Sequence, residues 1–351
     1  MATSRSNSPA SPSDAGVSPS AAGEPSPPTW TSRALLSWIQ RHLAERGIDS
    51  PRVAAELLLA SVLGCERMRL YMEPERPASP EERGRLRDLV ARAARHEPVQ
   101  YLLGEAWFLA RPYEVGPAVL IPRPSTEVLV EEAIRWWRAQ EFSRAMRALD
   151  VGTGSGCIAV SLAAETRPRT RVSERFERRR SAVVEGTEPM PPAVEATSPP
   201  SPPPPFRVTA VELCEKALAV AARNVARHGV ADSVDLRRGD LLAPVAGEEP
   251  FDLLASNLPY ISDAEWAKVA PNVRDHEPTL ALRGGRDGLD LIRRLVKDAP
   301  ARLVGGGLLL LEVQYDQGPA LREMLAAGPW RDVRIARDHE GHDRLAVATR
   351  A

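Results

Sequence analysis

The sequence predicts an α/β fold with a doubly wound, Rossmann-like sheet, preceded by a small helical domain. From Arg147 onward, short apolar runs alternate with helical stretches, which is typical of a sheet that carries helices on both faces. Between residues 30 and 97 the apolar side chains instead recur at helical spacing, as at Leu36, Ile39 and Leu43. A chain of 351 residues is also long enough for one large domain and a smaller companion.

Two Pro-rich stretches fall outside this pattern. Residues 1–28 and 189–205 contain many of the 33 prolines, and such segments bury too little apolar surface to offset the entropy lost on ordering. We expect both to be disordered, the second within an insertion at about 171–206 that separates the first two strands. The expected organisation is a tail at 1–28, a helical domain at 30–97, a linker at 98–125 and an α/β domain at 126–351.

Two helix starts are visible in the helical domain. Ser50 followed by Pro51 is typical of a cap and a first-turn proline. Ser79 with Glu82 three residues later predicts a capping box. In the α/β domain, apolar runs predict strands at 148–151, 208–211, 233–236, 251–255, 308–313 and 345–349.

Composition limits the location and the partners. With 46 Lys+Arg against 47 Asp+Glu, nothing in the total charge points to nucleic acid or to a membrane surface. Cys65, Cys157 and Cys214 lie far apart, which disfavours a disulfide framework and suits a reducing compartment. Because there is neither a membrane-length apolar run nor a signal-peptide pattern, we expect a cytoplasmic protein and, by default, a monomer.

A glycine-rich loop follows the first predicted strand. Its alternating glycines would let the backbone turn tightly and approach a ligand closely. A simple tight turn and a dinucleotide site remain alternatives, although the spacing is GxGxG instead of the GxGxxG of dinucleotide folds. Cofactor contacts are expected from Asp150, Gly152, Thr153, Gly154, Ser155 and Gly156.

Acidic residues end the next two predicted strands. Glu212 is placed to accept hydrogen bonds from both ribose hydroxyls of a nucleoside, and removing the insertion restores the usual spacing from the glycine loop. Asp240 is placed to meet an adenine amino group, with Leu241 against the ring. A helix-capping carboxylate at 212 and an ordinary turn aspartate at 240 are the alternatives.

The fourth predicted strand ends in a reactive motif formed by Asn257, Leu258, Pro259 and Tyr260. The Asn257 side-chain oxygen and the next backbone carbonyl can accept both protons of a planar NH2 group, on which Tyr260 can stack. The delocalised lone pair makes such a nitrogen a poor nucleophile, so alignment and charge stabilisation are needed. A proline turn with an ordinary core tyrosine is the structural alternative.

This motif resembles the Asn-Pro-Pro-Tyr motif of methyltransferases that act on planar nitrogens, with Leu258 in place of the first proline. Residues 98–104, 119–127 and 273–289 are similar to segments of the release-factor glutamine methyltransferase family. The family usually has an acidic residue where Ser125 stands, and serine can still cap a helix. The resemblance covers nearly the whole chain from Trp30 onward, apart from the Pro-rich insertion.

The resemblance implies a class I S-adenosylmethionine-dependent methyltransferase that modifies the glutamine of the Gly-Gly-Gln motif of peptide chain release factors. It also implies that the helical domain docks the release factor and that the product is N5-methylglutamine. The residues expected to line S-adenosylmethionine are Gly152, Thr153, Gly154, Ser155, Gly156, Glu212, Asp240, Leu241 and Asn257. The residues expected to hold the glutamine are Asn257, Leu258, Pro259 and Tyr260.

Other functions stay open from the residues alone. An amino-group methyltransferase for adenine or cytosine in nucleic acid would use the same motif, but no basic stripe with interleaved aromatics accompanies it. A noncatalytic nucleoside-binding scaffold and a nicotinamide dehydrogenase are further alternatives.

His339 and His342 flank Glu340 and Gly341. This pattern predicts a turn between closing strands instead of a metal site. Cys157 is expected to be a small apolar residue that fills space in the core.

Overall fold

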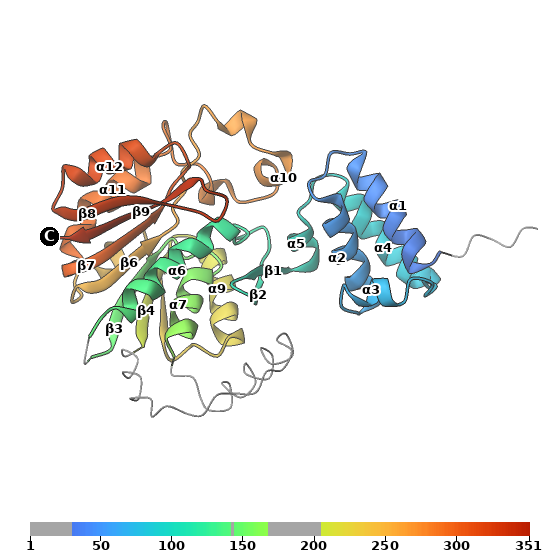
Figure 1. Cartoon of the computed structure of the whole chain (residues 1–351), viewed down its shortest axis with the longest axis horizontal. Coiled ribbons are helices and arrows are strands. Elements are labelled where there is room, and N and C mark those ends of the chain that lie inside the picture. Colours follow the sequence, from blue (N-terminus) through green and yellow to red (C-terminus); the bar gives the residue numbers. More distant parts are fainter. Residues whose placement is uncertain (1–29, 142–143, 168–204) are drawn as a thin grey trace, which may run out of the picture.

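The computed structural model describes residues 30–141, 144–167 and 205–351 (Figure 1). The tail predicted at 1–28 lies outside the described residues, and so does most of the insertion predicted at about 171–206. At the end of that predicted interval, Phe206 already begins a strand. No helix among the described residues is long and apolar enough to cross a bilayer.

The first part of the described chain is helical, as its spacing predicts, and lies to one side of the sheet in Figure 1. Its buried core includes Ile39 and Leu43 together with Leu58 and Leu59 from the next helix. The helices are α1 (Ser32–Ala44), α2 (Pro51–Leu63), α3 (Arg69–Met72), α4 (Pro80–Ala93) and α5 (Val99–Leu103).

The two predicted helix caps differ in outcome. The capping box is confirmed, because the Ser79 hydroxyl accepts from the Glu82 N–H and the Glu82 carboxylate accepts from the Ser79 N–H. The prediction for Ser50 is wrong in detail. Ser50 adopts a left-handed φ of 49° and its side chain caps nothing, although Pro51 does begin the helix. The left-handed backbone turns the serine oxygen away from the geometry that a cap requires.

A seven-stranded sheet forms the α/β domain, with the order β5-β4-β3-β6-β7-β9-β8. The strands from β5 to β7 are parallel, whereas β9 runs antiparallel to β7 and β8 antiparallel to β9. The strands are β3 (Met146–Val151), β4 (Phe206–Glu212), β5 (Val234–Arg238), β6 (Phe251–Ser256), β7 (Leu303–Glu312), β8 (Trp330–Arg337) and β9 (Asp343–Arg350).

All the strands predicted by residue range in this domain are confirmed. No range was predicted for β8, although the turn expected at His339 and His342 implied a strand before it. β8 is an edge strand in which only Trp330 is fully buried, and charged residues such as Arg331 and Asp332 interrupt its apolar pattern. Charged edge strands lack the alternation that identifies half-buried ones. A short antiparallel hairpin, β1 (Glu105–Phe108) with β2 (Arg111–Glu114), was also missed.

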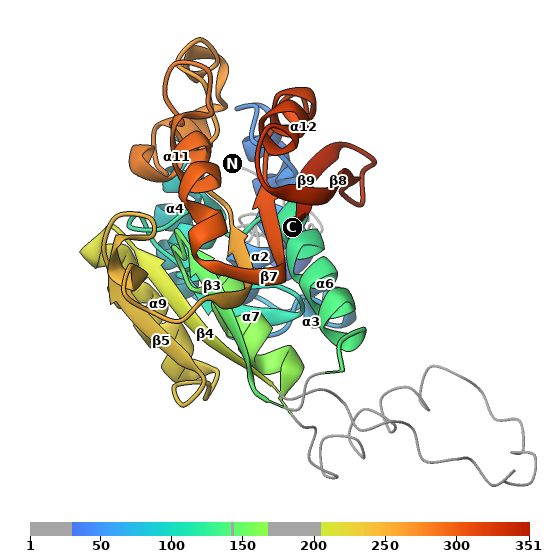
Figure 2. The same cartoon turned by 90° about the vertical axis from the view of Figure 1, so that its left-hand side faces the viewer.

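Helices cover both faces of the sheet (Figure 2). One face packs against α6 (Pro124–Arg138), α7 (Cys157–Thr166) and α9 (Glu215–Arg227). The other face packs against α11 (Asp290–Asp298) and α12 (Gly318–Ala326). Successive residues of a strand alternate between the two faces, so Leu308 and Leu310 contact the first layer while Leu309 and Leu311 contact the second. The shorter helices are η1 (Ala243–Val245), η2 (Trp266–Lys268), α10 (Pro271–Arg274), η3 (Thr279–Ala281) and η4 (Ala299–Ala301).

The position of β3 determines where a ligand can bind. The chain passes from β3 to β4 and β5 on one side, and then to β6 and β7 on the other side. The crossovers therefore leave in opposite directions above β3 and β6, which opens a crevice at the carboxyl ends of these strands. The predicted glycine loop follows β3 and the predicted reactive motif follows β6, so the fold brings both to this crevice.

Asn224 connects three parts of this fold and is fully buried on α9. Its side chain accepts from the Glu114 N–H at 2.7 Å and donates to the Glu114 carbonyl at 3.0 Å and the Ser155 carbonyl at 2.8 Å. It thus ties the β1–β2 hairpin and the glycine loop to α9.

We expect Asn224→Ala to lower the free energy of unfolding by about 3 kcal/mol, because one buried and two partly buried backbone groups lose their partner. Urea denaturation measures this change. The neighbouring Arg223→Ala is a matched control, because Arg223 makes only a solvent-exposed ion pair with Glu114, which is worth at most about 1 kcal/mol. Equal losses in the two variants would contradict the connecting role of Asn224.

Candidate active site

A cleft lies at the carboxyl ends of β3, β4, β5 and β6, as the strand order requires. Residues 152–155, 212–214, 239–241 and 257–259 form its walls, with further contacts from the linker before α6 and from the segment after α10. Most of the lining is apolar, and the carboxylates of Glu212 and Asp240 are the acidic groups in it. An apolar cleft with a few well-placed polar groups is typical of a small-molecule site.

The glycine loop has the backbone that its sequence predicts. Gly152, Gly154 and Gly156 all have positive φ values, of 76°, 56° and 81°, which glycine adopts without steric cost. A β-carbon at Gly152 would lie 3.2 Å from the Leu258 side chain, and one at Gly156 would lie 3.3 Å from the Ala221 side chain. The loop therefore packs directly against the reactive motif on one side and against α9 on the other.

Asp150 holds this loop from behind and does not line the cleft. Its carboxylate is fully buried and accepts from the Thr153 hydroxyl at 2.6 Å and from the Ala159 N–H at 3.1 Å. Burial raises the pKa of the Asp150 carboxyl to about 7, although the hydrogen bond from Thr153 lowers it. Asp150, expected to contact the cofactor, is placed by the structure to shape the loop. Gly156 also lies outside the cleft lining, while Thr153, Gly154 and Ser155 form part of it.

Glu212 lines the cleft and also supports the loop beside it. One carboxylate oxygen accepts from the Gly154 N–H and the other from the Cys214 N–H, both at 2.9 Å. A carboxylate offers about four lone-pair sites, so each oxygen can still accept from a ligand hydroxyl. The bond from the N–H of Cys214, the N-cap residue of α9, shows that Glu212 also supports the start of that helix, and its contact with a ribose stays a prediction.

Asp240 and Leu241 follow β5 and both line the cleft. One oxygen of Asp240 accepts from the Arg294 guanidinium of α11 at 2.5 Å, and the second oxygen remains available to a ligand amino group. Leu241 adopts a left-handed φ of 46°, which costs a residue with a β-carbon roughly 1 kcal/mol. Such strain at a ligand-facing position is common at functional sites.

The reactive motif begins where β6 ends. Asn257, Leu258 and Pro259 line the cleft. The Asn257 amide donates one of its two hydrogens to the Thr126 hydroxyl at 3.1 Å, and its oxygen is left to accept from a ligand.

Tyr260 differs from its expected placement. Its ring does not line the cleft and packs against the core under the second face, and burial raises its pKa above the usual value. Its backbone carbonyl accepts from the Gln317 side chain at 3.0 Å. In this arrangement Tyr260 anchors the motif, and the stacking of its ring on a substrate stays a prediction.

The backbone of the motif is held by glycines that the sequence reasoning quoted without a role. A β-carbon at Gly284 would lie 2.5 Å from the Pro259 carbonyl oxygen, and one at Gly288 would lie 2.1 Å from the Tyr260 carbonyl oxygen. Only glycine permits so close an approach between these two stretches of backbone. The clustering of glycines at 284–288 was the signal that could have identified this support.

The linker is tied to the other side of the cleft. The Glu277 side chain is fully buried, forms an ion pair with Arg123 and accepts from the Ile121 N–H at 3.0 Å. The N-cap residue of α6 is Arg123, so the capping role expected for Ser125 is wrong. The Ser125 hydroxyl instead donates to Glu312 at 3.3 Å. Thr126, Arg123, Glu277 and Glu312 were missed, because nothing in the sequence shows that they meet.

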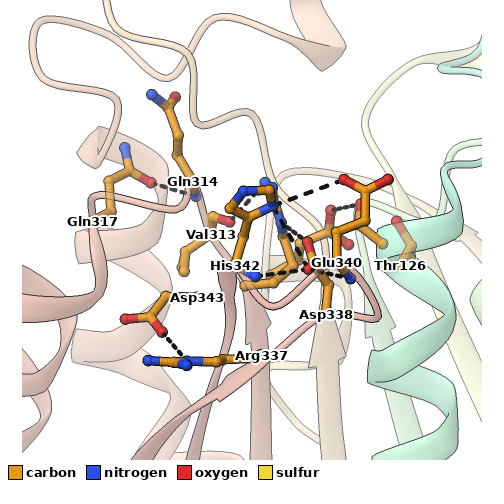
Figure 3. A network of polar contacts seen from close by, with 12 residues as sticks. Thr126, Val313, Gln314, Gln317, Arg337, Asp338, Glu340, His342 and Asp343 are labelled. Carbon is orange, nitrogen blue, oxygen red and sulfur yellow. Dashed lines mark hydrogen bonds and ion pairs between the residues drawn. The ribbon is translucent and has the colours of Figure 1, made fainter.

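The turn predicted around His339 and His342 is present between β8 and β9, and Figure 3 shows it at Asp338, Glu340 and His342. Asp338 accepts from the backbone N–H groups of Glu340 and His342 and from the Arg344 guanidinium, which closes the turn. Among the described residues, no group of His, Cys, Asp or Glu is arranged to hold a metal ion. Burial raises the pKa of the Cys157 thiol to about 12, as expected for an inert apolar filler.

The strand order, with the glycine loop after β3 and carboxylates after β4 and β5, defines a class I S-adenosylmethionine-dependent methyltransferase. Comparison with known proteins narrows this class. The family description "PrmC N-terminal domain" matches residues 34–104. The chain is 39% identical to the release factor glutamine methyltransferase of Geobacter sulfurreducens, over 91% of this chain and 96% of that protein.

Other relatives with the same name give similar values. The protein of Chlorobaculum tepidum is 35% identical over 91% of this chain and 97% of its own length. The protein of Cereibacter sphaeroides is 37% identical over 90% of this chain and 96% of its own length. The chain belongs to the release factor glutamine methyltransferase family, and S-adenosylmethionine is its cofactor. The cleft fits this cofactor, because its apolar walls suit an adenine ring and Glu212 suits a ribose.

We expect Glu212→Gln to weaken S-adenosylmethionine binding about tenfold or more, because hydrogen bonds to a charged acceptor are worth about 1.5–3 kcal/mol. Isothermal titration measures the dissociation constant. The control is Glu215→Gln, which alters a largely exposed carboxylate at the first residue of α9, where it is paired with Arg238. Unchanged affinity in the Glu212 variant would remove this residue from the cofactor site.

Proposed function

We propose that this protein transfers a methyl group from S-adenosylmethionine to the side-chain amide nitrogen of the glutamine in the Gly-Gly-Gln motif of peptide chain release factors. The product is N5-methylglutamine. The observation that supports this most directly is the orientation of Asn257, whose amide NH2 is bound by Thr126 while its oxygen is free to accept in the cleft. Asn257 adjoins the glycine loop of the cofactor site through Leu258 and Gly152.

The residues at 257–260 are proposed to perform three tasks for the glutamine. The Asn257 oxygen and the Leu258 carbonyl accept the two amide protons, which fixes the nitrogen with its lone pair toward the cofactor. The same two dipoles stabilise positive charge as it develops on nitrogen. Pro259 and Tyr260 keep this backbone in place through Gly284, Gly288 and Gln317.

The bonds change in a single displacement. When bound, S-adenosylmethionine supplies an electrophilic methyl group on a sulfonium, whose carbon–sulfur bond breaks with the electron pair left on sulfur. The amide nitrogen forms the new bond to carbon and then releases one proton to water. No strong base is required in the site, because the proton becomes acidic only as the nitrogen is alkylated.

Docking of the release factor is assigned to the helical domain at 30–97 and to the mouth of the cleft. Leu213 and Leu280 line the cleft and have 48% and 56% of their surface exposed, which suits contact with a protein loop. On the helical domain, Met68 and Met72 are exposed at 67% and 75%. Exposed apolar side chains of this kind mark protein interaction sites when they cluster.

Charge argues against a nucleic-acid substrate. Many arginines of the helical domain are paired with acidic residues and would not be free to bind phosphates. These pairs are Arg33–Glu75, Arg52–Glu56, Arg67–Glu56, Arg69–Glu73, Arg76–Glu82 and Arg92–Glu97. The proposal therefore excludes nucleic acid as the substrate and retains a cytoplasmic, monomeric enzyme, in keeping with the free thiols of Cys65, Cys157 and Cys214.

The direct test is mass spectrometry of an unmethylated bacterial-type release factor after incubation with this protein and S-adenosylmethionine. We expect one added methyl group, located on the Gly-Gly-Gln peptide, and none when that glutamine is replaced by alanine in the substrate. Methylation that persists in the alanine substrate would contradict the proposed site. Transfer to single-stranded DNA or RNA but not to the release factor would favour the amino-group alternative.

We expect Asn257→Ala to reduce kcat by at least about a hundredfold, because preorganised groups of this kind contribute about 10²–10³ in rate. The dissociation constant of S-adenosylmethionine should rise far less. Single-turnover transfer of a radiolabelled methyl group and isothermal titration provide the two values. Undiminished turnover in this variant would rule out the role of Asn257.

A further inference from the structure

We propose that Arg123 binds the α-carboxylate of S-adenosylmethionine, the anionic group at the methionine end of the cofactor. Arg123 ends the linker directly before α6, and it belongs neither to the glycine loop nor to the reactive motif. The proposal takes from the proposed function only the direction of the methyl group, toward the reactive motif. Its test uses no release factor.

The charge of the cleft creates a need for a cation. The lining is mostly apolar, and its acidic groups, Glu212 and Asp240, carry the same sign of charge as the cofactor carboxylate. A carboxylate that leaves water for such surroundings is unfavourable unless a cation and hydrogen-bond donors compensate it. Of the described residues that line the cleft, Arg123 is the only basic one.

The position of Arg123 matches the end of the cleft where the methionine part is expected. Glu212 follows β4 and Asp240 follows β5, so the nucleoside predicted to contact them lies on that side of β3. The sulfonium is expected to face the reactive motif, which follows β6 on the other side of β3. Thr126, three residues after Arg123, accepts from the Asn257 amide at 3.1 Å, so the start of α6 adjoins this second end.

The Arg123 guanidinium is held in place by a buried partner. Its Nη2 atom donates to one oxygen of the Glu277 carboxylate, and the other oxygen accepts from the Ile121 N–H at 3.0 Å. The contact therefore fixes both the arginine and the linker backbone beside it. An arginine that is already fixed loses little freedom when it binds a ligand, and its planar group can bind a carboxylate through two parallel hydrogen bonds.

Part of the guanidinium remains available for this second carboxylate. Arginine has five N–H donors, and the Nε and Nη1 atoms of Arg123 have no hydrogen-bond partner within residues 30–141, 144–167 and 205–351. The Arg123 side chain is 31% exposed, whereas the Glu277 side chain is 0% exposed. Because Arg123 lines the cleft and Glu277 is enclosed behind it, the accessible part of the ion pair is the cation.

The backbone beside Arg123 also favours an anion. Arg123 is the N-cap residue of α6, a helix of 15 residues, and the amino end of a helix carries a partial positive charge of about half an elementary charge. The helix end and the guanidinium thus place positive potential at the same corner of the cleft.

Two other arginines near the cleft are engaged elsewhere. Arg294 of α11 donates to Asp240 at 2.5 Å, at the end expected to hold the nucleoside. Arg344 of β9 donates to Asp338 at 3.2 Å and to the Val313 carbonyl at 3.4 Å. Both positions are outside the cleft lining, which leaves Arg123 to balance the cofactor carboxylate.

The test compares S-adenosylmethionine with decarboxylated S-adenosylmethionine, which lacks only the carboxylate, by isothermal titration of the full-length protein. We expect the unmodified protein to bind S-adenosylmethionine about tenfold or more tightly than the decarboxylated form. In the double variant Arg123→Met, Glu277→Gln this preference should fall below about threefold. The second substitution is included because removing Arg123 alone would leave the Glu277 charge buried without its partner.

Three further variants serve as controls. Glu277→Gln alone keeps Arg123 and should keep the preference for the carboxylate. Arg123→Lys keeps the positive charge but loses the planar pair of donors, so it should retain a reduced preference. Arg144→Met removes an arginine from the buried Asp252 at the amino end of β6, opposite the cleft. It should leave both affinities unchanged.

The ratio of the two affinities separates a direct contact from general damage, because a distorted cleft weakens both ligands alike and leaves the ratio unchanged. A preference that persists in the double variant overturns the proposal. Equal binding of the two ligands by the unmodified protein overturns it as well. Loss of the preference in the double variant, in an enzyme found to methylate no release factor, would support the role of Arg123 and refute the proposed function.

Discussion

The close contact between the loop after β3 and the residues after β6 is the constraint on which the site depends. A β-carbon at Gly152 would come within 3.2 Å of the Leu258 side chain and 3.8 Å of the Asn257 carbonyl oxygen. The loop proposed to hold the cofactor and the residues proposed to hold the glutamine therefore pack against each other. Methyl transfer requires donor and acceptor atoms to be brought to about 3–3.5 Å, and under the proposed function this packing places the two binding sites side by side. Parallel neighbouring strands with opposite crossovers are what bring the two loops to one edge.

Buried polar side chains maintain this edge, and each has a structural task. Asp150 orders the glycine loop, Asn224 ties that loop to α9, and Glu277 holds the linker against the segment that follows α10. Burying such groups is unfavourable unless they are hydrogen-bonded, so they restrict the backbone to the arrangement that satisfies them. Asp150 and Glu312 each keep one carboxylate oxygen without a hydrogen-bond partner among the described residues, and burial raises the pKa of both carboxyl groups to about 7.

The sequence predicted what depends on local pattern, and it missed what depends on packing between distant segments. The central strands, the glycine loop and the motif at Asn257 follow from apolar runs and glycine spacing, and all are found where expected. The edge strand β8 was missed because its exposed charges mask the alternation. Arg123 and Glu277 were missed because they are 154 positions apart in sequence and meet only in the folded chain. The packing of the partly buried Tyr260 ring against the second face of the sheet likewise depends on distant segments, so no local pattern could reveal it.

The measurement that tests the central claim most directly is a crystal structure of this protein with S-adenosylhomocysteine and a release-factor domain that carries the Gly-Gly-Gln loop. The account predicts that the glutamine NH2 group donates to the Asn257 side-chain oxygen and to the Leu258 carbonyl, with its nitrogen facing the cofactor sulfur past Gly152. A glutamine amide bound elsewhere, or an Asn257 side chain that presents its NH2 group to the substrate, would contradict it.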